Sequence, residues 1–189
     1  MANEQRSTAA GADSQALTFV LGSETYGIDI LRVQEIRGWS AVTRLPHAPP
    51  HVLGVLNLRG SIVPVVDLRM RFALQEVAYL PVTVIIVVAV MSAAGRRDFG
   101  LVVDGVSDVV TVDVGRIKAA PEIGLQEATA FIRGLVPIND KMVVLLDIDR
   151  LIGSDIARLR NEPSAESAAA ASADAVSGTG SQGETSVAA

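Results

Sequence analysis

Tyr26-Gly27-Ile28-Asp29-Ile30 is the stretch that decides the fold, because a similar stretch, Phe99-Gly100-Leu101-Val102-Val103, returns 73 positions later. Each has an aromatic residue, a glycine and then apolar residues at alternate positions, as a strand with one buried face requires. Three further positions match at the same offset: Val33 with Val106, Glu35 with Asp108, and Ile36 with Val109. The sequence therefore indicates one β pattern present twice.

A second match supports the duplication. Gly54 precedes a strand-like run that ends at Asp67, and Gly134 precedes one that ends at Asp147. In both copies the aspartate follows the glycine by 13 positions, as expected if the same two-stranded hairpin had been built twice. We therefore expect two superposable β-barrels, one centred on residues 26–67 and the other on residues 99–147.

Composition favours an all-β fold with small helices. Hydrophobic residues make up 49% of the 189 residues but aromatic residues only 4%, so the core must consist mainly of Val, Ile and Leu. Branched side chains of this kind favour strands. A short helix is expected after Asp149. The predicted strands are residues 17–21, 25–30, 52–58, 62–66, 82–91, 98–103, 109–112, 132–137 and 142–148, and the helix would place Leu151, Ile152, Ile156 and Leu159 on one face.

The chain divides into a flexible N-terminal arm (1–15), a folded domain (16–160) and a disordered Ser/Ala-rich tail (161–189). The tail has almost no apolar side chain larger than alanine, so burial would not offset the entropy of ordering it. Arm and tail together carry the whole net charge of −5. The folded domain is therefore neutral and offers no basis for nucleic-acid binding.

Residues 77–94 contain no charge, which raises the question of a membrane helix. Pro81, Thr83 and Ser92 interrupt the segment, and only residues 82–91 are densely apolar. This length is better explained by a strand buried on both faces, so no direct membrane insertion is expected. The first fifteen residues lack the basic and then apolar pattern of a signal peptide, which favours a cytoplasmic protein.

The search for catalytic chemistry finds little, and no metal site or cofactor is predicted. The chain has no cysteine, and His47 and His51 flank two prolines with no evident third ligand. A distant alternative is a two-lobed aspartic-type hydrolase, in which Asp67 and Asp147 would share a proton. Neither aspartate stands in the Asp-Thr/Ser-Gly turn of such enzymes, so each is expected to cap the helical turn that follows its strand.

The hairpin of residues 54–69 carries the most unusual feature, an arginine next to a glycine at its tip. Gly60 suits a turn position with positive φ, and Pro64 requires a position whose amide the sheet does not need. Arg59 would then be held by two stiff strands. A guanidinium held in this way is a good anchor for a partner's carboxylates.

Five stretches of the sequence together form a family pattern. They are Tyr26-Gly27-Ile28-Asp29-Ile30, Val33-Gln34-Glu35-Ile36-Arg37-Gly38, Asn57-Leu58-Arg59-Gly60, Val63-Pro64-Val65-Val66-Asp67-Leu68-Arg69 and Val102-Val103-Asp104-Gly105-Val106-Ser107-Asp108-Val109. By these motifs the sequence resembles the CheW-type coupling proteins of bacterial chemotaxis, over about residues 17–159 and in family order. The resemblance implies two interlocked, SH3-like five-stranded β-barrels.

By this resemblance the protein is a non-catalytic adaptor that links the cytoplasmic tip of methyl-accepting chemoreceptors to the regulatory domain of the histidine kinase CheA. It would be cytoplasmic and recruited to membrane-associated receptor arrays. Arg59 and Glu35 match motif residues tied to partner binding, and the same surfaces are implied for Val33, Gly54, Gly60, Thr83 and Val109.

Alternatives remain at this stage. The closest is an adaptor of the same type for another chemosensory system, such as twitching or surface sensing. The chain departs from the family pattern in its tail and in the proline-rich loop of residues 45–51, and this loop could alter which partners are accepted.

Overall fold

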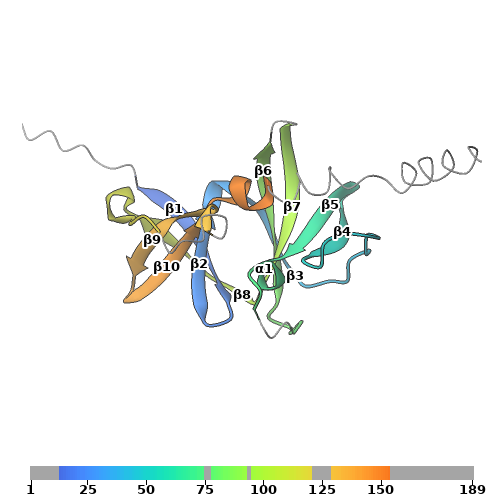
Figure 1. Ribbon diagram of the computed structural model, residues 1–189, viewed down its shortest axis with the longest axis horizontal. Helices are drawn as coiled ribbons and strands as arrows, with labels where there is room; N and C mark the ends of the chain where they lie inside the picture. Colours follow the sequence, from blue (N-terminus) through green and yellow to red (C-terminus); the bar gives the residue numbers. More distant parts are fainter. Residues whose placement is uncertain (1–12, 75–77, 93–94, 121–128, 154–189) are drawn as a thin grey trace, which may run out of the picture. The chain divides into compact units, whose positions relative to one another are not determined.

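The computed structural model describes residues 13–74, 78–92, 95–120 and 129–153. Most of the predicted arm, the predicted tail, and the helix residues Ile156 and Leu159 lie outside the described residues. Two five-stranded sheets account for most of what is described (Figure 1). The fold is all-β, as predicted.

The first sheet, sheet A, has the order β8-β1-β2-β10-β9. Its strands are β1 (Ser14–Leu21), β2 (Glu24–Asp29), β8 (Gly105–Val112), β9 (Ile132–Ile138) and β10 (Lys141–Leu146). Sheet B has the order β3-β6-β7-β5-β4. Its strands are β3 (Val33–Gly38), β4 (Val52–Leu58), β5 (Ser61–Asp67), β6 (Val84–Ser92) and β7 (Gly95–Val103).

Within residues 13–74, 78–92, 95–120 and 129–153, helical structure forms only short pieces. Helix α1 (Leu68–Arg71) follows β5, and residues 148–153 form the equivalent turn after β10. The 3-10 turn η1 (Ile30–Arg32) links β2 to β3, and η2 (Val114–Arg116) follows β8. The helix expected after Asp149 therefore begins slightly earlier, at residue 148.

The duplication is confirmed, and so are the two interlocked five-stranded sheets that the resemblance implied, but the expectation of one barrel centred on each copy is wrong. The two sheet orders become identical when β1 to β5 are replaced by β6 to β10 and the reverse. Sheet A thus takes β1 and β2 from the first copy and β8, β9 and β10 from the second. Sheet B takes β6 and β7 from the second copy and β3, β4 and β5 from the first. Figure 1 shows blue β2 beside orange β10. The short link after each central strand, η1 or the single residue Asp104, carries the chain into the other sheet.

Register shows how closely the two copies agree. In sheet A, Gly27 of β2 lies opposite Leu145 of the parallel strand β10. In sheet B, Gly100 of β7 lies opposite Val65 of the parallel strand β5. These are the same positions of the repeat, since 27 and 100 differ by the 73 residues found in the sequence.

Each sheet is closed by a single bridge between its two ends. In sheet B the segment after β3 returns to β4 through hydrogen bonds between Thr43 and Val55, and in sheet A Lys118 pairs with Leu135 in the same way. A glycine stands next to each bridge. A Cβ on Gly54, which has a φ of 144°, would overlap the carbonyl oxygen of Thr43, and one on Gly134 would lie 2.7 Å from that of Lys118.

Each barrel has its own apolar core, and aromatic rings connect the two. Strand β6 is buried on both faces along most of its length, as predicted for the uncharged segment. Phe72, just after α1 in sheet B's half, packs against Tyr26 of β2 with ring centroids 5.5 Å apart, and stacks on Phe131 at 5.2 Å. Among the described residues, no helix is long and apolar enough to cross a bilayer.

The structure contains one strand that was not predicted. Strand β3 has no fully buried residue, and its partly buried and exposed residues alternate. The partly buried face carries Glu35 and Arg37, so hydrophobic alternation gives no signal there. Its pairing with β6 stabilises it instead.

The close approach at Gly54 gives a first prediction. Gly54→Ala should lower the free energy of unfolding by about 2 to 4 kcal/mol, because the new methyl group would collide with backbone that the barrel closure holds in place. Gly60→Ala is the matched control. Gly60 also has a positive φ, of 92°, but no atom lies within 4 Å of the added methyl group, so only a backbone cost of about 1 kcal/mol is expected. Urea unfolding measures both. Equal destabilisation by the two variants would contradict the assigned role of Gly54.

Candidate partner-binding site

The tip of the β4–β5 hairpin is a two-residue turn. Leu58 pairs with Ser61, and the residues between them, Arg59 and Gly60, have φ values of 52° and 92°. Two positive φ values in succession are the mark of the type I′ turn, whose twist matches that of the strands on either side. The side-chain oxygen of Asn57 accepts a hydrogen bond from the amide of Gly60 at 2.8 Å. The turn is therefore held in one geometry.

The equivalent turn of the other copy shows what is unusual about Arg59. Between β9 and β10 the two turn residues are Asn139 and Asp140, with φ values of 46° and 62°. Asparagine and aspartate tolerate this backbone conformation, whereas a long side chain such as arginine rarely adopts it. Backbone strain of this kind is concentrated at functional sites, so Arg59 is a candidate for function.

Arg59 and Glu35, which sequence reasoning placed on one surface, are in contact. The Nη2 atom of Arg59 donates to the Oε2 atom of Glu35 at 3.2 Å. The Arg59 side chain is 84% exposed and that of Glu35 is 28% exposed. Because β3 and β4 are the two ends of sheet B, this ion pair joins the hairpin tip to the opposite edge of the barrel.

Two exposed isoleucines lie close to this pair along the chain, and sequence reasoning did not select them. Ile36 follows Glu35 on β3 and is 44% exposed, and Ile62, on β5 just beyond the turn, is 64% exposed. Ile36 lies on the face of β3 opposite to Glu35, because side chains alternate along a strand. Exposed apolar side chains of this kind are common in protein contact surfaces. The repeat could have indicated Ile36, because Ile36 matches Val109, which is one of the predicted site residues.

The other predicted site residues are placed differently. Val33 is partly buried on β3, and Val109 is exposed on β8 of sheet A, paired with Leu17. Gly54 and Thr83 are buried. The hydroxyl oxygen of Thr83 accepts from the amide of Leu80 at 2.9 Å, so this side chain organises the loop before β6.

Asp67 and Asp147 are structural, as the capping interpretation predicted. The carboxylate of Asp67 is fully buried, accepts from the backbone amide of Arg69 at 2.9 Å and pairs with its guanidinium at 2.7 Å. Tyr79 also donates to it at 3.1 Å, and burial, with the Asp67 charge as a further cause, raises the pKa of Tyr79. Asp147 accepts from the amide of Arg150 at 3.1 Å. The two aspartates end strands in different sheets.

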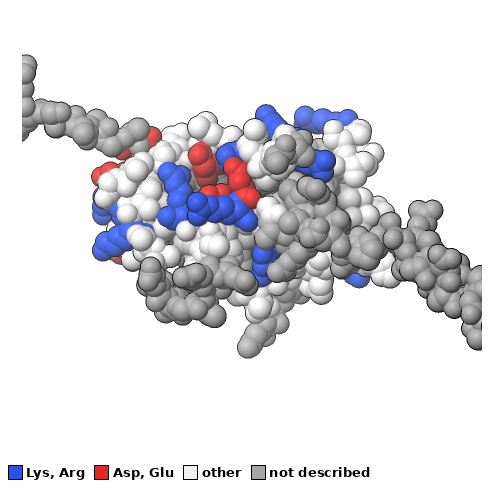
Figure 2. Space-filling view, turned by 45° about the horizontal axis from the view of Figure 1, so that its top comes forward, with Lys and Arg blue, Asp and Glu red and all other residues white. Residues whose placement is uncertain are grey.

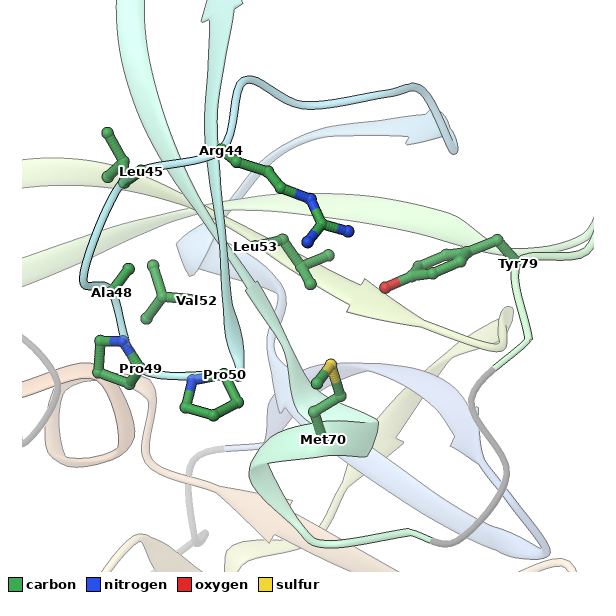
Figure 3. Close-up of a pocket in the computed structure, with 9 residues that line it drawn as sticks. All are labelled: Arg44, Leu45, Ala48, Pro49, Pro50, Val52, Leu53, Met70 and Tyr79. Carbon is green, nitrogen blue, oxygen red and sulfur yellow. The ribbon is translucent and has the colours of Figure 1, made fainter.

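The proline-rich loop forms one wall of a cavity of about 380 Å³ (Figure 3). Ala48, Pro49 and Pro50 line one side, and the side chains of Arg44 and Tyr79 extend from the other. His47, in the same loop, has a φ of 58°. Within the described residues, no group of three or more potential metal ligands is found, and this includes both histidines.

Charges of both signs lie close together on the face shown in Figure 2. The described residues include a pocket of about 200 Å³ that is lined by side chains of both charges: Asp29, Arg32, Arg133, Asp147 and Asp149. Such intermixed charges differ from the continuous basic surface that binds nucleic acid.

Comparisons with known proteins agree with this arrangement. Residues 15–155 match the CheW-like domain. The chain is 48% identical over 139 residues to the chemotaxis protein CheW of Klebsiella aerogenes, a match that covers 74% of this chain and 81% of that protein. It is 30% identical to CheW of Bacillus subtilis, over 74% of this chain and 86% of that one.

A solved structure is also similar. The crystal structure of the scaffolding protein TtCheW from Thermoanaerobacter tengcongensis matches with a TM-score of 0.65 and 31% identity, over 74% of this chain and 87% of the other. These matches remove the hydrolase alternative. The chain belongs to the CheW-like family and is a chemotaxis adaptor of the scaffold type, not an enzyme.

Proposed function

We propose that this adaptor couples methyl-accepting chemoreceptors to the regulatory domain of the histidine kinase CheA, and that the β4–β5 turn is a contact surface. The observation that carries the proposal is the exposed Arg59 side chain on a strained, fixed turn, with Glu35 beside it. In this role the protein would be cytoplasmic and recruited to membrane-associated receptor arrays.

The charges of the turn suit a partner that presents acidic side chains or backbone carbonyls. The ion pair between Arg59 and Glu35 is largely solvated on the arginine side, and such pairs contribute about 0 to 1 kcal/mol. Arg59 therefore loses little when a partner carboxylate replaces Glu35. The fixed turn also reduces the conformational entropy lost on binding.

Coupling requires more than binding two partners at once. A receptor can shift the kinase between two states only if the assembled contacts differ in free energy between those states. Contact residues on rigid strands transmit such a difference better than residues on loose loops. The β4–β5 hairpin meets this condition, since backbone pairing holds it on both sides of its tip.

The remaining predicted residues would act in two ways. Gly60 shares the turn, and Val33 and Val109 would contribute apolar contact on strands β3 and β8. Gly54 and Thr83 are buried, so they would influence binding through the shape of sheet B's barrel.

Reversal of the turn charge gives a second prediction. Arg59→Glu should leave the fold intact, yet reduce receptor-stimulated CheA activity at least about tenfold, because like charges that face each other across an interface cost several kcal/mol. Reconstitution of receptor, kinase and this protein measures the activity, and circular dichroism checks the fold.

A double variant separates the partner contact from the internal ion pair. Arg59→Glu with Glu35→Lys restores opposite charges within the chain but leaves the turn acidic. If the turn contacts a partner, the double variant should remain defective. Recovery of wild-type stimulation would show that only the internal pair matters, and wild-type activity of folded Arg59→Glu would contradict the site itself.

The strain at Arg59 gives a third prediction. Arg59→Asn should raise the free energy of unfolding by up to about 1 kcal/mol, because asparagine tolerates a positive φ and already occupies the equivalent turn at Asn139. The same variant should lose kinase coupling, since it lacks the guanidinium. Asn139→Arg is the matched control and should lower stability without affecting coupling. Urea unfolding and the reconstituted assay check both variants, and a less stable Arg59→Asn protein would contradict the strain argument.

The choice between chemosensory systems requires a separate test. A relative with 27% identity over 76% of this chain bears a different name, Protein FrzA from Myxococcus xanthus. A pull-down against each CheA paralogue and receptor of the cell would identify the system. Retention by a kinase of a twitching or surface-sensing system alone would replace the chemotaxis partners in this proposal.

A further inference from the structure

Two ion pairs stand at the ends of the parallel strand pairs, one in each sheet. Beyond β5 and β7, Arg69 Nη1 lies 3.0 Å from Asp104 Oδ1. Beyond β2 and β10, Arg32 Nη2 lies 2.6 Å from Asp149 Oδ2. The Arg69 side chain is almost fully buried, whereas Arg32 and Asp149 are each about one-third exposed.

The two pairs occupy similar, though not identical, places in the repeat, since Asp104 matches Leu31, the neighbour of Arg32, at the 73-residue offset. Arg69 and Asp149 each stand two residues after the aspartate that ends a strand. Asp104 and Arg32 each lie in the short link that leaves a central strand. The carboxylate of each pair also accepts a backbone amide, from Gly22 to Asp104 and from Met91 to Asp149, at 2.7 Å in both cases.

The polarity of the two pairs is opposite. In the first pair the residue after the strand, Arg69, is basic and the link residue is acidic. In the second pair the residue after the strand, Asp149, is acidic and the link residue, Arg32, is basic. The two copies of the repeat therefore carry similar ion pairs, Arg69–Asp104 and Arg32–Asp149, with the charges exchanged.

We propose that this reversed polarity makes the chain pair its strands between copies and disfavours pairing within a copy. In pairing within a copy, β2 would lie beside β5 and β7 beside β10. Arg32 would then face Arg69, and Asp104 would face Asp149. Like charges in these places would repel each other and so raise the free energy of that arrangement.

Backbone register does not distinguish pairing between copies from pairing within a copy. Gly27 and Gly100 stand at the same place in their strands, and their partners Leu145 and Val65 are both branched aliphatic residues. A glycine is needed in either case, because an added Cβ would come within 3.0 Å of Leu145 or 2.9 Å of Ile85. The strands of one copy could therefore pair with each other in the same register, and the charges oppose this.

The same incorrect strand pairing could occur between two chains. If β2 of one molecule paired with β5 of a second, the product would be a strand-exchanged oligomer. The charges of the two ion pairs would oppose that contact as well, since Arg32 and Arg69 would again meet. The polarity thus favours a folded chain that keeps its strands in the observed order.

Cysteine trapping can test the proposal, since the chain contains no cysteine of its own. Thr25→Cys with Val143→Cys reports the observed pairing, because Thr25 and Val143 are directly opposite. Thr25→Cys with Val63→Cys reports pairing within a copy, as residue 63 takes the place of 143 in the other hairpin. Oxidation during refolding, followed by a non-reducing gel and peptide mapping, gives the yield of each cross-link within and between chains.

The decisive double variant, Arg32→Asp with Asp149→Arg, reverses the charges of the more exposed ion pair. Its native pair keeps opposite charges, but opposite charges now also meet when β2 pairs with β5. We expect the yield of the 25–63 cross-link, within or between chains, to rise about tenfold. The matched control, Arg32→Lys with Asp149→Glu, keeps the polarity and should give the wild-type yield.

Two results would overturn the proposal. One is a reversed variant whose 25–63 yield equals that of the control, including the case in which neither reporter cross-links. The other is an equal rise in both double variants, which would show that loss of native side-chain geometry, and not polarity, permits the wrong pairing. The Arg69–Asp104 pair is left unchanged in every variant, so the buried Asp67 keeps its partner.

Discussion

The structure depends on the parallel pairing of central strands from different copies of the repeat, β2 with β10 and β5 with β7. Neither copy can complete a five-stranded sheet with its own strands in this arrangement, so each barrel requires the other. Parallel pairing between strands that are distant in the sequence adds non-local contacts, which are typical of slow folding. The ring stacking of Phe72 on Phe131 joins the same two halves.

This interlocking would make the proposed contact surface rigid. The β4–β5 hairpin is paired with β7 on one side, and Thr43 closes the barrel on the other. The buried pair of Asp67 and Arg69 fixes the end of β5. A turn supported in this way can hold Arg59 in a strained conformation, because the surrounding structure determines it. For an adaptor, such rigidity lets a change at one partner reach the other.

The sequence predicted much of the fold because glycines and aspartates, as well as apolar residues, recur at matching positions of the repeat. It placed Gly54 and Gly134, and Asp67 and Asp147, in equivalent positions, and the pairing confirms this. The exchange of strands was indicated only by the resemblance, which implied interlocked barrels, because apolar alternation is the same whichever strand pairs with which. Strand β3 was missed because its partly buried face carries Glu35.

The candidate site was predicted in part for similar reasons. Arg59 came from the chemistry of the hairpin and Glu35 from the motif resemblance, and their contact follows from barrel closure, which no local pattern reveals. The burial of Thr83 likewise depends on the tertiary fold.

The most direct test of the central claim is hydrogen exchange of this protein, measured by mass spectrometry with and without the CheA regulatory domain and the receptor tip. If the turn is a contact surface, partner binding should slow amide exchange in peptides that contain Gly60 and Glu35, and leave the β9–β10 turn at Asn139 unchanged. Protection confined to β9 and β10, with unaltered exchange around Gly60, would contradict it.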